Sequence, residues 1–271
     1  MSLFIASLNS GSNGNCYYIG NQHEAVLVDA GISCREIEKR MKRLSLKMGM
    51  VKAIFVSHEH TDHISGLPTL TKKYNLPVYI TPGTLRDRGI KISQDLVNSF
   101  SAGEEILIGN LSVTAFTKYH DAGDPHSFIV KGNGVTIGVF TDLGRVCDQL
   151  IHHFKQCHAA FLEANYDVEM LENGSYPFYL KKRISGGMGH LSNDEALDLF
   201  TTHRPAYMSH LLLSHLSKNN NCPKLVQKLF QQNTDATVIA VSPRNEATKV
   251  YEITVGKMSK QIIPGLQMVM F

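Results

Sequence analysis

The segment "VKAIFVSHEHTDHISGL", residues 51–67, constrains this chain more than any other feature of its sequence. Within six consecutive positions, directly after an apolar run, it carries His58, His60, Asp62 and His63. Imidazole nitrogens and carboxylate oxygens are ligands for zinc, manganese and iron. In extended backbone, His58 and His60 point to the same side of the chain and can share one ion. Asp62 and His63 fall at the start of a predicted helix and can reach a second ion, so the segment predicts a site for two metals.

Two other interpretations of this cluster are weaker. The helical zinc-protease pattern H-E-x-x-H does not apply, because the residue four positions after His58 is Asp62 rather than a histidine. An exposed histidine-rich loop at a strand end would explain any single one of these histidines. Four ligand-type residues within six positions favour the metal site.

The distribution of apolar segments predicts an α+β fold with one domain over residues 1–271. Early strand-like segments are joined by turns rich in Gly, Asn and Ser, which indicates hairpins, whereas later strands alternate with helices. Such an order is typical of sheets covered by helices on their outer faces. The expected strands are 2–8, 15–20, 25–30, 51–57, 76–80, 105–116 with a turn at 109–110, 127–132, 134–142, 159–165, 208–215 and 237–242. The expected helices are 34–44, 64–74, 193–203 and 222–232.

Composition excludes several classes of protein. The longest apolar runs are far shorter than the roughly 20 residues that cross a bilayer, so no membrane association is expected. The N-terminal sequence lacks the basic and apolar regions of a signal peptide, and the five cysteines form no C-x-x-C pair, so a cytoplasmic location with reduced thiols is expected. The net charge of +3 does not by itself indicate a nucleic-acid binder, yet it would not repel a polyanionic substrate.

Further motifs allow a resemblance to be stated. "HEHTDH" resembles the H-x-H-x-D-H signature of the metallo-β-lactamase superfamily. "LVDAGI", "YHDAGDPHSF", "FTDLG" and "LLLSHLS" resemble its other motifs, in family order over residues 29–215. "SLNSGSNGNC", "LEANYD" and "GHLSN" resemble more narrowly its YycJ or WalJ branch, whose members are nuclease-like hydrolases related to tRNA-processing and messenger-RNA-decay nucleases. The resemblance implies a four-layer αββα sandwich with the site at the edge between two sheets.

The resemblance also implies a role for each motif residue. The implied ligands are His58, His60 and His120 for one ion and Asp62, His63 and His215 for the other, with Asp142 bridging both and Asp29 orienting ligands or bound water. His126 competes with His120 for the third-motif position. His120 is preferred because it directly follows the apolar strand "SVTAFTKY". The remaining histidines are not expected to bind metal: His23, His152, His153, His158, His203 and His210.

Glu163 and His190 form a second candidate pair. Glu163 ends a predicted strand, and His190 follows the glycine-rich "SGGMG". A lone loop histidine is usually a solvated side chain. In the related RNA-processing enzymes, however, a glutamate paired with a loop histidine assists phosphoryl chemistry. We therefore predict that Glu163 and His190 act in catalysis together with Asp62.

The predicted activity is that of a phosphodiesterase or nuclease with two divalent ions, either zinc, manganese or iron. A hydroxide shared by the ions would attack phosphorus in DNA or RNA, as in a 5'-3' exonuclease. Nucleic acid is the expected partner, and the expected assembly is a monomer or homodimer. The alternatives are a small-molecule hydrolase acting on a cyclic phosphodiester, lactone or thioester, and a non-catalytic metal-binding scaffold.

Two segments are candidates for substrate contact. The loop 9–15 could hold a phosphate, and the segment "YPFYLKKRIS" interleaves aromatic rings with cations that suit a single strand. An ordinary hairpin turn and an ordinary amphipathic surface explain these segments equally well. The candidate residues are Ser10, Ser12, Asn15, Lys181, Lys182 and Arg183.

Overall fold

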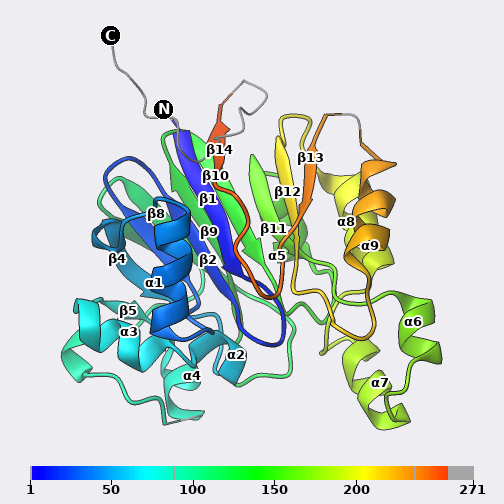
Figure 1. Cartoon of the computed structure of the whole chain (residues 1–271), viewed down its shortest axis with the longest axis horizontal. Helices are drawn as coiled ribbons and strands as arrows, with labels where there is room; N and C mark the ends of the chain where they lie inside the picture. Colours follow the sequence, from blue (N-terminus) through cyan, green and yellow to red (C-terminus); the bar gives the residue numbers. More distant parts are fainter. Residues whose placement is uncertain (1, 88, 235, 256–271) are drawn as a thin grey trace.

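Two mixed β-sheets form the centre of the molecule, which is seen here as a computed structural model describing residues 2–87, 89–234 and 236–255 (Figure 1). The strands of the first sheet are β1 Ser2–Asn9, β2 Cys16–Gly20, β3 Ala25–Val28, β4 Val51–Phe55, β5 Val78–Tyr79, β6 Val97–Asn98 and β14 Tyr251–Thr254. Those of the second are β7 Glu105–Ile108, β8 Leu111–Thr117, β9 His126–Gly132, β10 Val135–Phe140, β11 Ala159–Glu163, β12 His210–Ser214 and β13 Val238–Val241. Their orders are β14-β1-β2-β3-β4-β5-β6 and β13-β12-β11-β10-β9-β8-β7.

The two sheets are built in the same way. In the first, β1, β2 and β3 pair antiparallel, and β3 to β6 then pair parallel. In the second, β7 to β10 pair antiparallel, and β10 to β13 then pair parallel. The predicted change from hairpins to strands that alternate with helices is thus confirmed in each sheet. Parallel strands need long crossovers, and here each of these crossovers contains at least one helix.

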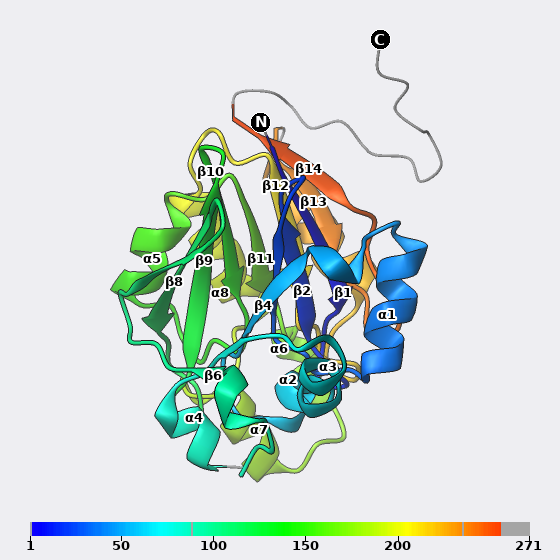
Figure 2. The same ribbon diagram turned by 90° about the vertical axis from the view of Figure 1, so that its left-hand side faces the viewer.

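Helices cover the outer face of each sheet. On the first sheet these are α1 (Cys34–Arg43) and α3 (Leu67–Tyr74), and on the second α5 (Asp148–Phe154), α8 (Asn193–His203) and α9 (Pro223–Gln231) (Figures 1 and 2). One apolar core lies between the sheets, and one lies under each helical layer. The predicted four-layer αββα sandwich, folded as one domain, is therefore confirmed.

Short helices gather at one end of the sandwich. They are α2 (Thr61–Ile64), α4 (Pro82–Asp87), α6 (Val168–Asn173) and α7 (Phe178–Ser185), and they lie at the bottom of Figure 1, opposite the first residues of β1. Two 3₁₀ turns, Met48–Met50 and Gln94–Leu96, complete the helical elements of the described residues. The parallel strands end at this edge, so residues from many parts of the chain meet there.

The helix expected over 64–74 is in fact two helices, because the chain breaks at Gly66. The Gly66 N–H donates to the Ala30 carbonyl at 2.8 Å, and a Cβ at Gly66 would lie 1.9 Å from the Ile32 carbonyl oxygen. This close approach, which only glycine permits, turns α2 away from α3.

The sequence pattern also missed α4, α6, α7, β6 and β14, which are short elements with weak periodicity. Part of the predicted domain, residues 256–271, lies outside the described residues.

Candidate metal centre

The candidate ligands all follow the ends of strands at one edge of the sandwich. In the first sheet, Asp29 follows β3, and the 58–63 segment follows β4. In the second sheet, His120 follows β8, Asp142 follows β10, and His215 follows β12. Ligand sites in sheets with parallel strands form outside the carboxyl ends of those strands. The topology therefore brings together residues that are far apart in sequence.

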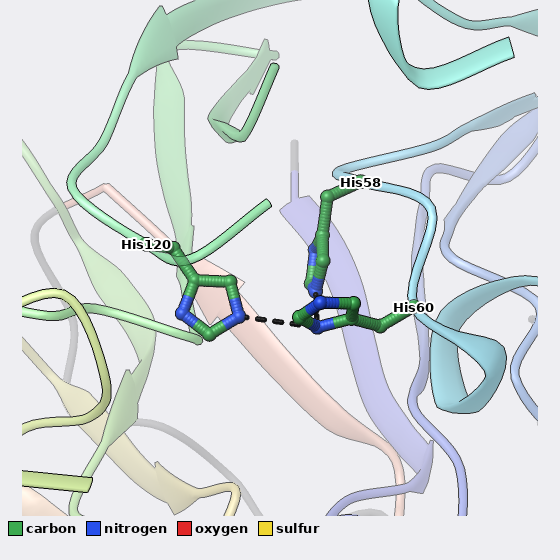
Figure 3. A group of neighbouring side chains, drawn as sticks. All are labelled: His58, His60 and His120. Carbon is green, nitrogen blue, oxygen red and sulfur yellow. Dashed lines mark hydrogen bonds between the residues drawn. The ribbon is translucent and has the colours of Figure 1, made fainter. Parts of the chain in front are cut away.

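Three imidazoles form one group of potential ligands. His58 Nε2 lies 3.1 Å from His60 Nδ1, and His120 Nε2 lies 3.3 Å from the same atom (Figure 3). His58 and His120 are buried, and His60 is partly exposed. The three nitrogens converge from opposite sheets on one point, which is the arrangement that a single ion requires.

Neighbouring acceptors fix which nitrogen of each buried ring is free. The Ser57 hydroxyl donates to Asp29 Oδ2 at 2.8 Å and can accept from His58 Nδ1 at 2.9 Å. His120 Nδ1 donates to the Gly189 carbonyl at 3.0 Å. Both rings thus keep an Nε2 lone pair for a metal. Burial lowers the pKa of His58 well below its usual value and that of His120 to about 3, so both are neutral and able to coordinate.

A second group combines Asp62, His63 and His215. Asp62 Oδ2 lies 3.6 Å from the Nε2 atoms of both His63 and His215. Their opposite nitrogens are held by buried carboxylates, since His63 Nδ1 donates to Asp29 Oδ2 at 2.7 Å and His215 Nδ1 donates to Glu163 Oε1 at 2.9 Å. The Nε2 atoms of this group therefore also face the centre.

Asp142 lies between the two groups. Its Oδ2 is 3.3 Å from His63 Nε2, and its Oδ1 is 3.5 Å from His215 Nε2 and 3.9 Å from His120 Nε2. Burial disfavours its charged form, but the adjacent imidazoles outweigh burial and hold the pKa of Asp142 well below its usual range. An ionised carboxylate in this position can contact ions in both groups.

The donor set fits divalent metal ions. Asp142 Oδ2 and His215 Nε2 are buried, yet neither has a hydrogen-bond partner anywhere in the described ranges. Buried polar atoms normally have partners, so two such atoms that face the same point fit the ligands of a cation. Carboxylates also raise the pKa of His63 well above its usual value and that of His215 to about 10, although burial opposes both shifts. The raised pKa values mean that the Nε2 atoms of His63 and His215 carry protons in the metal-free protein, and a metal would replace these protons.

Three residues of the centre have a left-handed backbone. The φ angles are +61° at Asp29, +56° at Asp142 and +55° at His215. Positive φ is uncommon outside glycine and costs conformational energy, and such strain tends to cluster at functional sites. Each of these residues lies one or two positions after the end of a strand, so the sharp bend there directs its side chain towards the centre.

Glu163 connects His190 to the second group. Its Oε1 accepts from Nδ1 of both His190, at 2.8 Å, and His215, at 2.9 Å. Its Oε2 accepts from the backbone N–H of Leu143 at 2.6 Å and of Leu191 at 3.3 Å. Burial opposes ionisation, but the two imidazoles lower the pKa of Glu163 to about 2. The sequence predicted the pairing with His190 but not the contact with His215.

A cavity of about 190 Å³ opens beside this pair. His190 and His215 form one wall, and α7 forms another. The remaining lining residues are Ser12, Asp121, Asn165, Tyr176, Leu180, Arg183, Ile184, Gly189 and Ser217. Because the His190 side chain is 22% exposed and holds Glu163 through Nδ1, its Nε2 is available to a molecule in this cavity.

The loop 9–15 supports the centre rather than presenting an open surface. Ser10 is fully buried, and its hydroxyl accepts from the His215 N–H at 2.7 Å. Asn15 is also fully buried, and its Nδ2 donates to Asp62 Oδ2 at 3.2 Å. Of the three loop residues predicted to contact substrate, Ser12 is the one that is exposed and lines the cavity.

The predicted cations of "YPFYLKKRIS" separate onto two faces of α7. Arg183 faces the cavity and forms an ion pair with Asp121, with Nε 2.5 Å from Oδ2. Lys181 and Lys182 line a different groove, together with Phe178, between α7 and α6. The three cations therefore do not act as one cluster.

The other histidines lie outside the centre. The His126 ring packs against Phe100 with ring centroids 5.3 Å apart, so the structure brings His120 rather than His126 to the ligands. His210 is at the far end of β12 and packs against Tyr251. Among the described residues, no group of potential metal ligands includes any of the histidines that the sequence analysis set aside.

Some residues of the centre were not predicted. Ser57 links His58 to Asp29, and its place directly before the histidine cluster is a signal that could have revealed it. Lys118 is buried, donates to the Thr141 carbonyl at 2.7 Å and has its pKa lowered by burial. Its position at the end of an apolar strand, two residues before His120, gave no sign of this burial.

Comparison with known proteins identifies the class. A family model described as "Beta-lactamase superfamily domain" matches residues 24–215, and the chain belongs to this family. The structure of the metallo-beta-lactamase fold protein YhfI from Bacillus subtilis superposes with a TM-score of 0.72 at 14% identity, covering 93% of this chain and 100% of that one.

Two relatives narrow the likeness to one branch. The chain is 36% identical to exodeoxyribonuclease YycJ of Bacillus anthracis, over 86% of this chain and 89% of the relative. It is 31% identical to exodeoxyribonuclease WalJ of Streptococcus pneumoniae, over 91% and 96%. The resemblance to the YycJ or WalJ branch is thus confirmed.

Within the described ranges, no helix has the length and hydrophobicity needed to cross a membrane.

Proposed function

We propose that this chain is a metal-dependent nuclease that hydrolyses phosphodiester bonds in nucleic acid. The observation that carries the proposal is the convergence of two ligand groups on the buried carboxylate of Asp142. A pair of ions held in this way suits in-line displacement at phosphorus. The names of the two relatives support an exonuclease and make DNA the first substrate to test.

The ligands in this proposal are those that the structure brings together. One ion would be held by His58, His60 and His120, and the other by Asp62, His63 and His215, with Asp142 between them. Nitrogen and carboxylate donors suit zinc, manganese or iron. When bound, the ions activate a water molecule and neutralise charge on the phosphate. The proposal also includes the cytoplasmic location and the monomeric or homodimeric state expected from the sequence.

The protein's own groups complete the reaction. His190 faces the cavity next to the ligand groups, so its Nε2 can protonate the leaving oxygen or hold a phosphate oxygen. Glu163 keeps the His190 proton on Nδ1 and fixes the plane of the ring. Asp29 does the same for His63, so that carboxylates orient imidazoles on both sides of the centre.

The test is cleavage of end-labelled single- and double-stranded DNA and RNA by protein loaded with manganese or zinc. Labels at the 5' and 3' ends distinguish an exonuclease from an endonuclease and give the direction of attack. Asp62→Ala should abolish cleavage, and His190→Ala should reduce it sharply. His23→Ala, which changes an exposed histidine in the turn between β2 and β3, is the matched control and should cleave as the wild type does.

Failure to cleave any polymer with both metals bound would overturn the nuclease. It would instead favour hydrolysis of a small cyclic phosphodiester, lactone or thioester. Cleavage that survives Asp62→Ala would mean that the activity does not arise from this centre.

A further inference from the structure

The row of parallel strands in the second sheet delivers one more polar residue to the site edge. Asp142 follows β10, Glu163 ends β11, and His215 follows β12. The next strand in the row, β13, is followed by the turn that carries Arg244. The carboxyl end of this strand therefore brings Arg244 to the same edge as the metal centre.

Hydrogen bonds tie the Arg244 guanidinium to a residue of the cavity wall and to the residue that follows His215. Nη2 donates to the Ser12 hydroxyl at 3.2 Å, and Ser12 lines the cavity. Nη1 donates to the carbonyl of Leu216 at 3.0 Å, and Leu216 directly follows His215. Gly11 permits this approach, because its φ is +134° and a Cβ there would lie 2.6 Å from Nη1.

The charge of Arg244 is not neutralised by a neighbour. Across the part of the chain that the structure describes, no carboxylate forms an ion pair with it, whereas Arg183, which lines the cavity, is paired with Asp121. Burial lowers the pKa of Arg244, and Tyr176 and Asp62 oppose this shift, so the cation lies within the field of the centre. Guanidinium has five N–H donors, and the contacts above account for two of them.

We propose that Arg244 and Ser12 form a subsite for a backbone phosphate of the substrate, next to the phosphate that is cleaved. A partly buried, unpaired guanidinium has donors arranged to match phosphate oxygens. The loop 9–15 contains no lysine or arginine, and its contact with Arg244 supplies a positive charge. This proposal rests on the proposed nuclease function, because it takes the anion to be part of a nucleic acid.

A purely structural role for Arg244 makes different predictions. The Asn13 side chain donates to the Arg244 carbonyl at 2.8 Å, so the backbone at this position also holds the loop. That bond does not depend on the arginine side chain. If the guanidinium served only to fix the loop, its loss would disturb Ser10 and Asn15 and release metal from His215 and Asp62.

The experiment measures binding of a fluorescent, hydrolysis-resistant phosphorothioate oligonucleotide to the metal-loaded full chain at several salt concentrations. For Arg244→Gln we expect about tenfold weaker binding and a decrease of about one in the slope of log K against log salt, the signature of one lost phosphate contact. Metal content and Tm should match the wild type. Lys131→Gln is the matched control: it removes one exposed charge near the end of β9 that lies away from the metal centre. It should leave the affinity and the salt slope unchanged.

Each outcome decides between the proposals. Unchanged affinity and slope in Arg244→Gln would overturn the phosphate subsite, whether or not the wild type cleaves nucleic acid. Loss of metal or a lower Tm together with weaker binding would assign Arg244 a structural role instead. If Arg244→Gln does not fold, Arg244→Lys is measured instead. Lysine keeps the positive charge but lacks the two parallel N–H donors of guanidinium, so the subsite predicts weaker binding with an unchanged salt slope. Weaker binding in Arg244→Gln without cleavage by the wild type would support the anion subsite and refute the nuclease.

Discussion

The first and second sheets supply the proposed metal centre in opposite ways. The first sheet contributes His58, His60, Asp62 and His63 from one turn after β4. The second sheet contributes one residue per strand end. Yet each ligand group combines both sheets, since His120 joins His58 and His60, and His215 joins Asp62 and His63. The comparison teaches that a compact motif is not a complete site: neither ion has its full set of ligands until the two sheets pack together.

The largest expected effect comes from the residue that the two groups share. Asp142→Asn keeps the shape of the side chain but removes the charge between His63 and His215. Cleavage should fall by about a thousandfold or more, because two-metal stabilisation supplies several kcal/mol and each 1.36 kcal/mol is tenfold in rate. Metal analysis should show less of both ions. A variant that keeps two ions per chain and full activity would refute the bridging role.

The accessory pair should have the next largest effect. His190→Ala should lower the cleavage rate by about 10²-fold or more, the usual contribution of a general acid, without loss of metal. Glu163→Gln should lower the rate and also weaken metal binding by about 10- to 100-fold, because Glu163 orients His215 as well. Rates combined with metal titrations distinguish the variants. Equal metal affinities in both would show that the His215 contact is unimportant.

Removal of metal should lower thermal stability, because each ion joins residues of the two sheets. At free metal of about 100 times Kd, one site adds about 2.7 kcal/mol. For a chain of this size, this corresponds to a Tm change of roughly 5–10 °C. Calorimetry with and without chelator measures the shift, and Asp62→Ala should retain only part of it. A Tm independent of metal would mean that the site does not connect the sheets.

The smallest expected effect is a difference between the two ligand groups in the number of protons released when metal binds. In the metal-free protein at pH 7, His58 and His120 are neutral because their pKa values are lowered, whereas the pKa values of His63 and His215 are raised and both rings carry protons. Binding at the second group should therefore release about two protons, and its affinity should fall more steeply as pH is lowered. Calorimetric titration with zinc in buffers of different ionisation enthalpy counts these protons. Equal release by both ions would contradict the assignment.

The sequence predicted best where the information was local. The 58–63 cluster could be recognised because its ligands share one turn, and its resemblance to a known signature supplied the αββα fold. The roles of Ser10 and Asn15 were not predictable, because whether a polar loop residue faces solvent or the centre depends on packing between distant segments. The same holds for Glu163, whose second partner His215 directly follows the neighbouring strand β12. The break at Gly66 depends on a backbone contact with Ile32 that periodicity does not reveal.

The left-handed backbone at Asp29, Asp142 and His215 sets folding against function. Each such residue costs about 1 to 3 kcal/mol relative to a relaxed conformation, and glycine would avoid most of that cost. A laboratory selection for heat resistance alone would therefore favour glycine at these positions. At Asp142 and His215 the survivors would lack side chains that face the metal centre. Thermostable variants of this protein should be screened for activity at every round. The mutations that most reduce backbone strain are those that remove side chains from the metal centre.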